Sequence, residues 1–224
     1  MPTNFPTSVD NFTNPTANDS LNLPSHSTQH ANANDAIEAI ETFLLPGGSG
    51  ASGLVRVIPT SATNGTVSAT GDVTFSGVSS LTINGCFTTT YTNYLLSFEI
   101  TAGTANVEVR AQFSASATPS STGYAYSRTA SDSAAASRFE GSNSIAQVPV
   151  TFIPYNSQIT TFITVRNPAQ AAFTHYTSQW FYDDGGTYMG GLLDARHRVA
   201  TAYDGIKFFN ATTMTGTVRV YGYK

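Results

Sequence analysis

YLLSFEI, residues 94–100, and ANVEVRAQFSA, residues 105–115, follow each other closely in the chain, with a short segment containing Gly103 between them. In both, apolar side chains occupy every second position, and most of the positions between them are polar or charged. This period of two is typical of a β-strand that has one face in a core and the other in solvent. The two segments therefore predict two β-strands, and they set the pattern for most of the chain.

The same alternation continues from Leu54 to the last residue. The expected strands are LVRVI, TVSAT, DVTFSG, SLTI, YLLSFEI, ANVEVRAQFSA, AQVPVTFI, TTFITVRN, FTHYTSQWFY, HRVATAY, IKFFN and GTVRVYGYK. Because no helical segment interrupts them, residues 54–224 are predicted to form a mostly-β domain, an antiparallel β-sandwich of the jelly-roll type. The last strand, Thr217–Tyr223, is expected to be paired. Gly123–Ser142 breaks the alternation and is expected to be a long surface loop.

A single helix is predicted over residues 22–45, with Asn22 as N-cap and Pro24 in the first turn. Pro46-Gly47-Gly48 ends it, and residues 46–53 form a Gly-rich hinge. Side chains spaced alternately by four and three residues predict the seam of a short coiled coil, and isoleucine at both kinds of seam position favours three strands. The seam residues are His26, His30, Ala33, Ile37, Ile40 and Leu44. The alternative is a helix that packs on its own domain.

Residues 1–21 form a polar segment with three prolines, which favours extended or turn backbone. Phe5, Val9 and Phe12 are isolated apolar side chains in this segment, which cannot bury enough surface to fold alone. Two interpretations follow. The segment is either a disordered tail or an extended arm whose apolar side chains anchor it to a partner.

The overall composition excludes several classes of protein. Charged residues are 11% of the 224, the net charge is -4, and the ten basic residues form no run, which argues against nucleic-acid binding. No apolar run approaches the length that spans a bilayer, and the first residues do not have the pattern of a secretory signal. Cys86 is the single cysteine, so no intrachain disulfide is expected.

Motifs for catalysis or cofactor binding are weak in this chain. There is no G-x-S-x-G and no phosphate-binding glycine loop, so we expect no catalytic residue and no cofactor. His26 and His30 have a spacing that can bind zinc, but polar residues stacked in the helical seam are the favoured interpretation, and no metal is expected. Asp183-Asp184-Gly185-Gly186 suits a hairpin turn better than a calcium loop or a pair of catalytic acids.

Aromatic residues near predicted loops are the candidates for ligand contact. They are Tyr124, Tyr126, Trp180, Tyr182 and Tyr188. Amphipathic rings at loop tips stack on sugars and donate hydrogen bonds, which points to a glycan. The alternative for each ring is a place in the core, since a domain of this size needs aromatic side chains there.

The segment Phe5–Glu41 resembles the N-terminal region of tailed-bacteriophage virion proteins known as tail fibre, minor tail or head-fibre proteins. The matching residues are Pro6-Thr7-Ser8, Asp10, Phe12, Ser25-His26-Ser27, Gln29-His30 and 34–41. The ending TGTVRVYGYK is similar to the last strand of β-sandwich tips in the same proteins.

This resemblance implies a structural protein of the virion, assembled in the host cytoplasm. The arm would dock on other virion proteins of the tail or capsid, the helix would bundle three copies, and the β tip would contact host-surface glycans without nucleic acid or membrane insertion. A capsid-mounted head fibre or decoration protein is the alternative, and a depolymerase or a carbohydrate-binding module is a more distant one.

Overall fold

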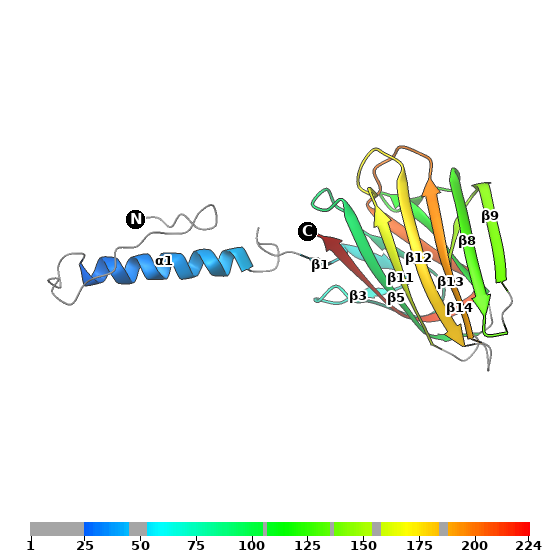
Figure 1. The fold of residues 1–224 in the computed structure, drawn as a ribbon, viewed down its shortest axis with the longest axis horizontal. Coiled ribbons are helices and arrows are strands. Elements are labelled where there is room, and N and C mark those ends of the chain that lie inside the picture. The colour runs from blue at the N-terminus through cyan, green and yellow to red at the C-terminus, as the bar shows by residue number, and fades with distance from the viewer. Residues whose placement is uncertain (1–24, 45–52, 105–106, 135–136, 154–157, 184–187) are drawn as a thin grey trace. The chain divides into compact units, whose positions relative to one another are not determined.

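The computed structural model describes residues 25–44, 53–104, 107–134, 137–153, 158–183 and 188–224 (Figure 1). The chain divides into two compact units, residues 1–55 with Lys224 and residues 56–223. The elements are α1 (His26–Leu44), β1 (Leu54–Val57), β2 (Ser61–Thr63), β3 (Thr66–Val67), β4 (Val73–Asn84), β5 (Asn93–Gly103), β6 (Val107–Ala115), β7 (Thr118–Pro119), β8 (Tyr124–Asp132), β9 (Ser137–Ile145), β10 (Val148–Ile153), β11 (Ile159–Arg166), β12 (Thr174–Asp183), β13 (Tyr188–His197) and β14 (Gly205–Tyr223).

Helix α1 begins at His26 because Ser25 caps it. The Thr28 amide donates to Ser25 Oγ at 3.3 Å, so the cap satisfies one of the orphan donors of the first turn. The Gln29 amide donates to the Ser25 carbonyl at 3.1 Å, which is the first hydrogen bond of the helix backbone. The expected cap Asn22 and the expected stop Pro46-Gly47-Gly48 lie outside the described residues. Residues 1–21 also lie outside them.

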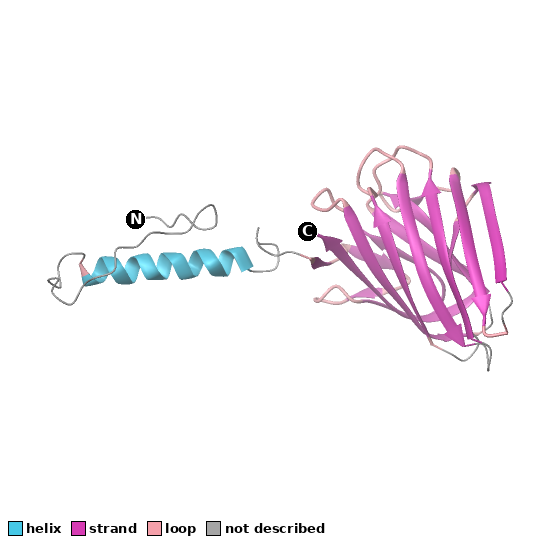
Figure 2. Ribbon diagram, viewed as in Figure 1, coloured by secondary structure: helices cyan, strands magenta, loops and turns pink. Residues whose placement is uncertain are grey.

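The prediction of a mostly-β, antiparallel fold is confirmed (Figure 2). The strands form one hydrogen-bonded sheet in the order β10-β6-β14-β5-β11-β12-β13-β8-β9, and β1 and β4 also pair with β14. The expected strands IKFFN and GTVRVYGYK are parts of the one long strand β14. Its first residues, Gly205–Phe209, pair with β6, whereas Met214–Gly222 pair with β5.

The change of partner along β14 falls between Phe209 and Met214, and Gly216 lies just beyond it, in the part that pairs with β5. The register between β14 and β5 shifts between Thr215 and Gly216. A Cβ on Gly216 would lie 2.0 Å from the Glu99 carbonyl oxygen, so only glycine allows the two backbones this close approach.

The sheet folds over so that β10 faces β11 and β12 across the core. Thr161 Oγ1 donates to Thr151 Oγ1 at 2.8 Å, Tyr176 Oη donates to the Pro149 carbonyl at 2.9 Å, and Ser178 Oγ donates to the Val150 carbonyl at 2.8 Å. These polar side chains are buried, and each hydrogen bond joins strands that are not neighbours in the sheet. They therefore hold β10 against β11 and β12 across the core.

Apolar side chains from both parts of the folded sheet form one core. Phe98 of β5 stacks on Phe208 of β14 with ring centroids 4.6 Å apart, and Phe113 of β6 packs edge-on against Tyr176 of β12 at 6.0 Å. Burying a side chain of this size contributes about 1.5–3 kcal/mol. Burial of these side chains thus stabilises strands that have one face in the core and the opposite face in solvent.

Two predictions about individual segments are wrong. Gly123–Ser142 is not a surface loop, because it contains β8 and the first part of β9, which pair antiparallel. Its many Ala and Ser residues hide the alternation of apolar side chains, although burial still alternates along β8. HRVATAY is not a strand: β13 ends at His197, and the next residues form the connection to β14.

Candidate functional site

The candidate site lies on the outer face of β11, β12, β13, β8 and β9, which are neighbours in the sheet (Figure 1). Side chains along β12 alternate, with Tyr176 and Trp180 buried and His175 and Phe181 exposed. Exposed side chains of the adjoining strands lie opposite the exposed ones of β12 in the strand registers. We call the solvent-facing surface of these five strands the outer face.

One end of the outer face carries a groove of about 340 Å³, which we call the cationic groove. Arg166 of β11, His175 of β12 and Arg196 of β13 lie directly opposite one another in the registers and line it. Neighbouring strands are about 4.8 Å apart, so the Cα atoms of the two arginines are about 10 Å apart. The other polar side chains of the lining are Ser127, Asn143, Thr177 and Asp194.

The arginines of the groove differ from most others in this protein. Within the described part of the chain, Arg166 and Arg196 make no ion pair, although both are exposed. Four other arginines pair with Asp or Glu; they are Arg56, Arg110, Arg128 and Arg219. The two groove arginines lie on β11 and β13, with His175 of β12 between them. Because they are exposed and form no ion pair among the described residues, the groove is a candidate site for an anionic group.

Contacts at the rim hold parts of the groove in place. The Arg196 guanidinium lies 4.5 Å from the centroid of the Phe173 ring, a cation–π contact. Arg198 Nη1 donates to the Asn143 carbonyl at 3.2 Å, which ties the end of β9 to the segment after β13. Asp194 is exposed two residues from Arg196 and faces the same side of β13. The groove thus offers two cations, one carboxylate and one amide to a ligand.

A second depression of about 330 Å³, which we call the apolar hollow, continues the outer face. Leu192 lies opposite Thr129, and Thr129 lies opposite Phe139. Phe139, Leu192 and Phe181 are 79%, 57% and 56% exposed. Gly190 lies opposite Phe181 and leaves the floor open, since a Cβ there would meet nothing nearer than 3.7 Å. Three large apolar side chains exposed together are typical of an interaction surface.

The aromatic residues proposed from sequence have different places in the fold. Tyr124 and Trp180 are buried, which favours the alternative of a core position for both, although Trp180 also lines the apolar hollow. Tyr124 Oη accepts from the Phe113 amide at 2.8 Å, which is why this polar ring can be buried. Tyr126 lines the cationic groove but packs against the core, and Tyr188 is 63% exposed at the start of β13. The side chain of Tyr182 lies outside the described residues.

The described side chains of the expected helical seam are exposed on α1. Ile37 is 54% exposed and Ile40 is 43% exposed, and His30 and Ala33 are exposed on the same helix. The side chains of His26 and Leu44 lie outside the described residues, as do the proposed arm anchors Phe5, Val9 and Phe12.

A contact between Ser120 and His197 has the residue types of a catalytic pair but the wrong proton arrangement. His197 Nε2 lies 2.9 Å from the Thr122 carbonyl, which can only accept, so this nitrogen carries the proton and has no lone pair for Ser120 Oγ at 3.1 Å. Tyr203 Oη then donates to Nδ1 at 3.1 Å. Burial lowers the pKa of His197, which favours this neutral form. The histidine joins three chain segments and has a structural role.

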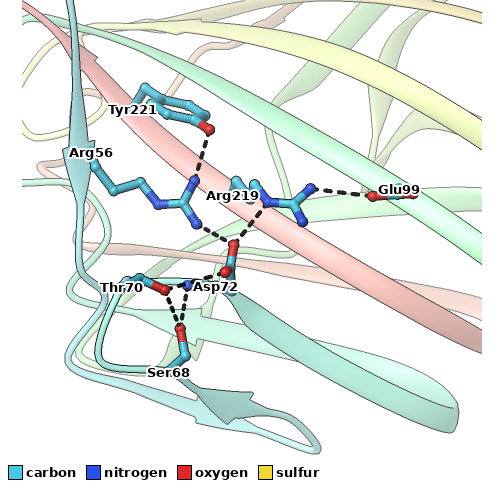
Figure 3. A network of polar contacts seen from close by, with 7 residues as sticks. All are labelled: Arg56, Ser68, Thr70, Asp72, Glu99, Arg219 and Tyr221. Atoms are coloured by element: carbon cyan, nitrogen blue, oxygen red, sulfur yellow. Dashed lines mark hydrogen bonds and ion pairs between the residues drawn. The ribbon is translucent and has the colours of Figure 1, made fainter.

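A polar network at β1, β14 and β5 is also structural (Figure 3). Asp72 accepts from Arg56 at 2.5 Å and from Arg219 at 2.8 Å, and Arg219 also pairs with Glu99 at 3.2 Å. Arg56 further donates to Tyr221 Oη at 2.8 Å. The hydrogen bond from Arg56 is the largest cause that lowers the pKa of Asp72. Because these charges satisfy one another, the network is not a binding site for a further ion.

None of the described residues forms a group of three or more His, Cys, Asp or Glu side chains that could hold a metal ion. The one helix in the described part of the chain lacks the length and apolar character that crossing a bilayer requires. Comparison with protein-family models, with curated proteins and with solved structures finds no match. A function is therefore inferred from the side chains themselves and from the resemblance of the N-terminal segment.

Proposed function

We propose that this protein is a non-enzymatic structural protein of a tailed-bacteriophage virion, a short trimeric tail fibre or minor tail protein that contacts the host surface. The observation that carries the proposal is the pair of exposed isoleucines on one side of α1, Ile37 and Ile40. A helix of 19 residues is marginal in water by itself. Neighbouring copies fill this face, and isoleucine at both seam positions favours three of them.

The N-terminal segment fastens the trimer to the particle in this proposal. Residues 5–41 resemble the arm and helix of virion fibre proteins, and the arm presents Phe5, Val9 and Phe12 as anchors. Each anchor that becomes buried contributes about 1.5–3 kcal/mol to docking. The low charge of the chain, 11% of residues, suits a protein crowded among symmetry copies.

The β domain is the tip of the fibre, an antiparallel sandwich of the jelly-roll type. Support for two facing layers comes from the hydrogen bonds that join β10 to β11 and β12 across the core. The outer face, with its groove and its hollow, then meets glycans of the host surface. Three tips in one trimer multiply weak contacts through avidity.

The trimer is tested by the mass of the full chain in solution. Ile37→Asp with Ile40→Asp places charge in the seam, so the double variant should have a smaller mass than the wild type, with unchanged β-sheet circular dichroism. Ala39→Asp with Thr42→Asp adds the same charge on the opposite side of the helix and should leave the trimer intact. A wild-type monomer at micromolar concentration would contradict the proposal.

The place on the virion is tested by deleting residues 2–21 and by imaging labelled particles. The truncated protein should stay soluble and fail to incorporate, because its anchors are lost. A label on the tail supports the fibre, whereas a label on the capsid would make the protein a head fibre or decoration protein. If the protein is absent from particles, a carbohydrate-binding module would replace the fibre as the proposed function. If the protein shortens a host polysaccharide, a depolymerase would replace it.

A further inference from the structure

We infer that the cationic groove binds the carboxylate of an acidic polysaccharide, with a uronic-acid residue held between Arg166 and Arg196. This inference deepens the proposed function, on which it rests for the source of the glycan. The observation behind it is the pair of exposed arginines on either side of His175, without an acidic partner among the described residues.

The guanidinium group is suited to this ligand. Its planar fork matches a carboxylate with two parallel hydrogen bonds, which are stronger than bonds between neutral groups. With Cα atoms about 10 Å apart on β11 and β13, the two arginines flank the exposed side chain of His175 on β12, and a ligand group can lie over this side chain between them. One arginine can hold the carboxylate while the other holds a further oxygen of the same sugar or the carboxylate of the next one.

The rest of the lining favours a sugar over a phosphate polymer. Asp194 is an acceptor for hydroxyl groups, and Ser127, Thr177 and Asn143 can both donate and accept. A polyhydroxylated ring therefore finds partners for its hydroxyl groups in this groove, whereas the phosphates of a polyphosphate or DNA chain offer Asp194 no hydroxyl donor.

The apolar hollow extends the site along the same strands. Asp194 of the groove and Leu192 of the hollow are consecutive outward positions of β13, about 7 Å apart along the strand. A saccharide chain with its carboxylate in the groove can therefore place the apolar face of a neighbouring sugar on Phe181 and Leu192. Combining apolar surface with a few polar groups is typical of carbohydrate sites.

The test is calorimetric titration of the full chain with short oligogalacturonates. The same oligomers as methyl esters keep the sugar and lose the charge, so they serve as the matched ligand control. Arg166→Gln with Arg196→Gln should weaken binding of the acid at least about tenfold, since each charge-assisted hydrogen bond is worth about that factor or more. Arg110→Gln with Lys207→Gln removes the same charge elsewhere and should leave binding unchanged. The methyl esters should not bind measurably.

Asp194→Asn tests the sugar contact separately from the charge. For a uronate ligand it should weaken binding, because a hydroxyl acceptor is replaced by a weaker one, although the positive charge of the groove increases. Inorganic polyphosphate and single-stranded DNA are the competing probes. Equal or tighter binding of either one, or tighter uronate binding by the Asp194 variant, would overturn the carboxylate-sugar assignment.

Further outcomes separate this inference from the proposed function. Equal losses in the groove variant and in the charge-matched control would show a general effect of charge and would overturn the site. No binding of oligogalacturonate by a wild-type trimer that incorporates into particles would also overturn the site but leave the fibre proposal in place. Specific binding by a chain that is monomeric and absent from particles would support the groove and contradict the fibre. Unchanged melting of each variant shows that its fold is intact.

Discussion

The hydroxyl pair Thr151–Thr161 offers a sharp test of the contact between β10 and β11 across the core. Both side chains are buried, at 1% and 0% exposure, and Thr161 Oγ1 donates to Thr151 Oγ1 at 2.8 Å. Thr151→Val removes the acceptor and leaves a buried hydroxyl donor, which costs about 1–3 kcal/mol. Thr161→Val should cost less, about 1 kcal/mol, because Thr151 keeps a further interaction. The double variant has no orphaned donor, so it should cost less than the sum by about 1 kcal/mol.

The assay is urea unfolding of the four proteins, followed by β-sheet circular dichroism, with melting temperatures as a second measure. For a domain of this size, 1 kcal/mol corresponds to about 2–4 °C. If β10 did not face β11, the two hydroxyls would be in solvent and each substitution would change stability by less than about 0.5 kcal/mol. Additive effects in the cycle would therefore refute the contact between β10 and β11 across the core.

Other predictions concern pH and backbone packing. The pKa of buried His197 lies below the ordinary 6.5, so the unfolded chain binds more protons than the folded chain below that pH. The free energy of unfolding should therefore fall as the pH drops below about 6.5. A free energy that stays constant in urea titrations between about pH 7.5 and 5 would contradict this prediction. Asp72→Asn should lower stability by about 1 kcal/mol at neutral pH through the loss of its arginine network. Because the pKa of Asp72 is lowered from 3.8, its contribution is present above that pH and is lost as pH falls through the lower folded value, so wild type and variant should converge in acid. Gly216→Ala should destabilise by about 3 kcal/mol, because its Cβ would clash with the Glu99 carbonyl, whereas Gly190→Ala, with open space, should stay within about 0.5 kcal/mol in the same unfolding assay.

Sequence reasoning identified the β-rich domain well where apolar and polar residues alternate clearly. In β5, Tyr94, Leu96, Phe98 and Ile100 are all buried, as the period of two requires. The same reasoning failed over β8 and β9, because Ala and Ser can occupy either face and leave little contrast. At HRVATAY the same reasoning predicted a strand where none exists. His197 and Tyr203 are buried because they contact each other and other segments, and not because they lie on one face of a strand.

The candidate site was largely missed from sequence. Tyr124 and Trp180 were proposed because aromatic residues near glycine suggest loop tips, but burial depends on which side of the sheet each ring faces. The arginines of the groove gave no signal, since Arg166 and Arg196 stand thirty residues apart and neither belongs to a charged run. One signal could have helped: each of the two arginines occupies a polar position in an alternating segment, and such positions face solvent.

The amino-acid sequence by itself determined the local conformations, which are strands from Leu54 onwards and a helix with an apolar seam. It could do so because the hydrophobic period, proline and glycine act over only a few residues. Only the tertiary structure decided which strands are neighbours and in what register. A strand's pairing is set by the packing of the whole core, and a shift of one residue would turn every side chain to the other face. The register Arg166–His175–Arg196 is such a consequence, and so is the fold of β10 over β11 and β12.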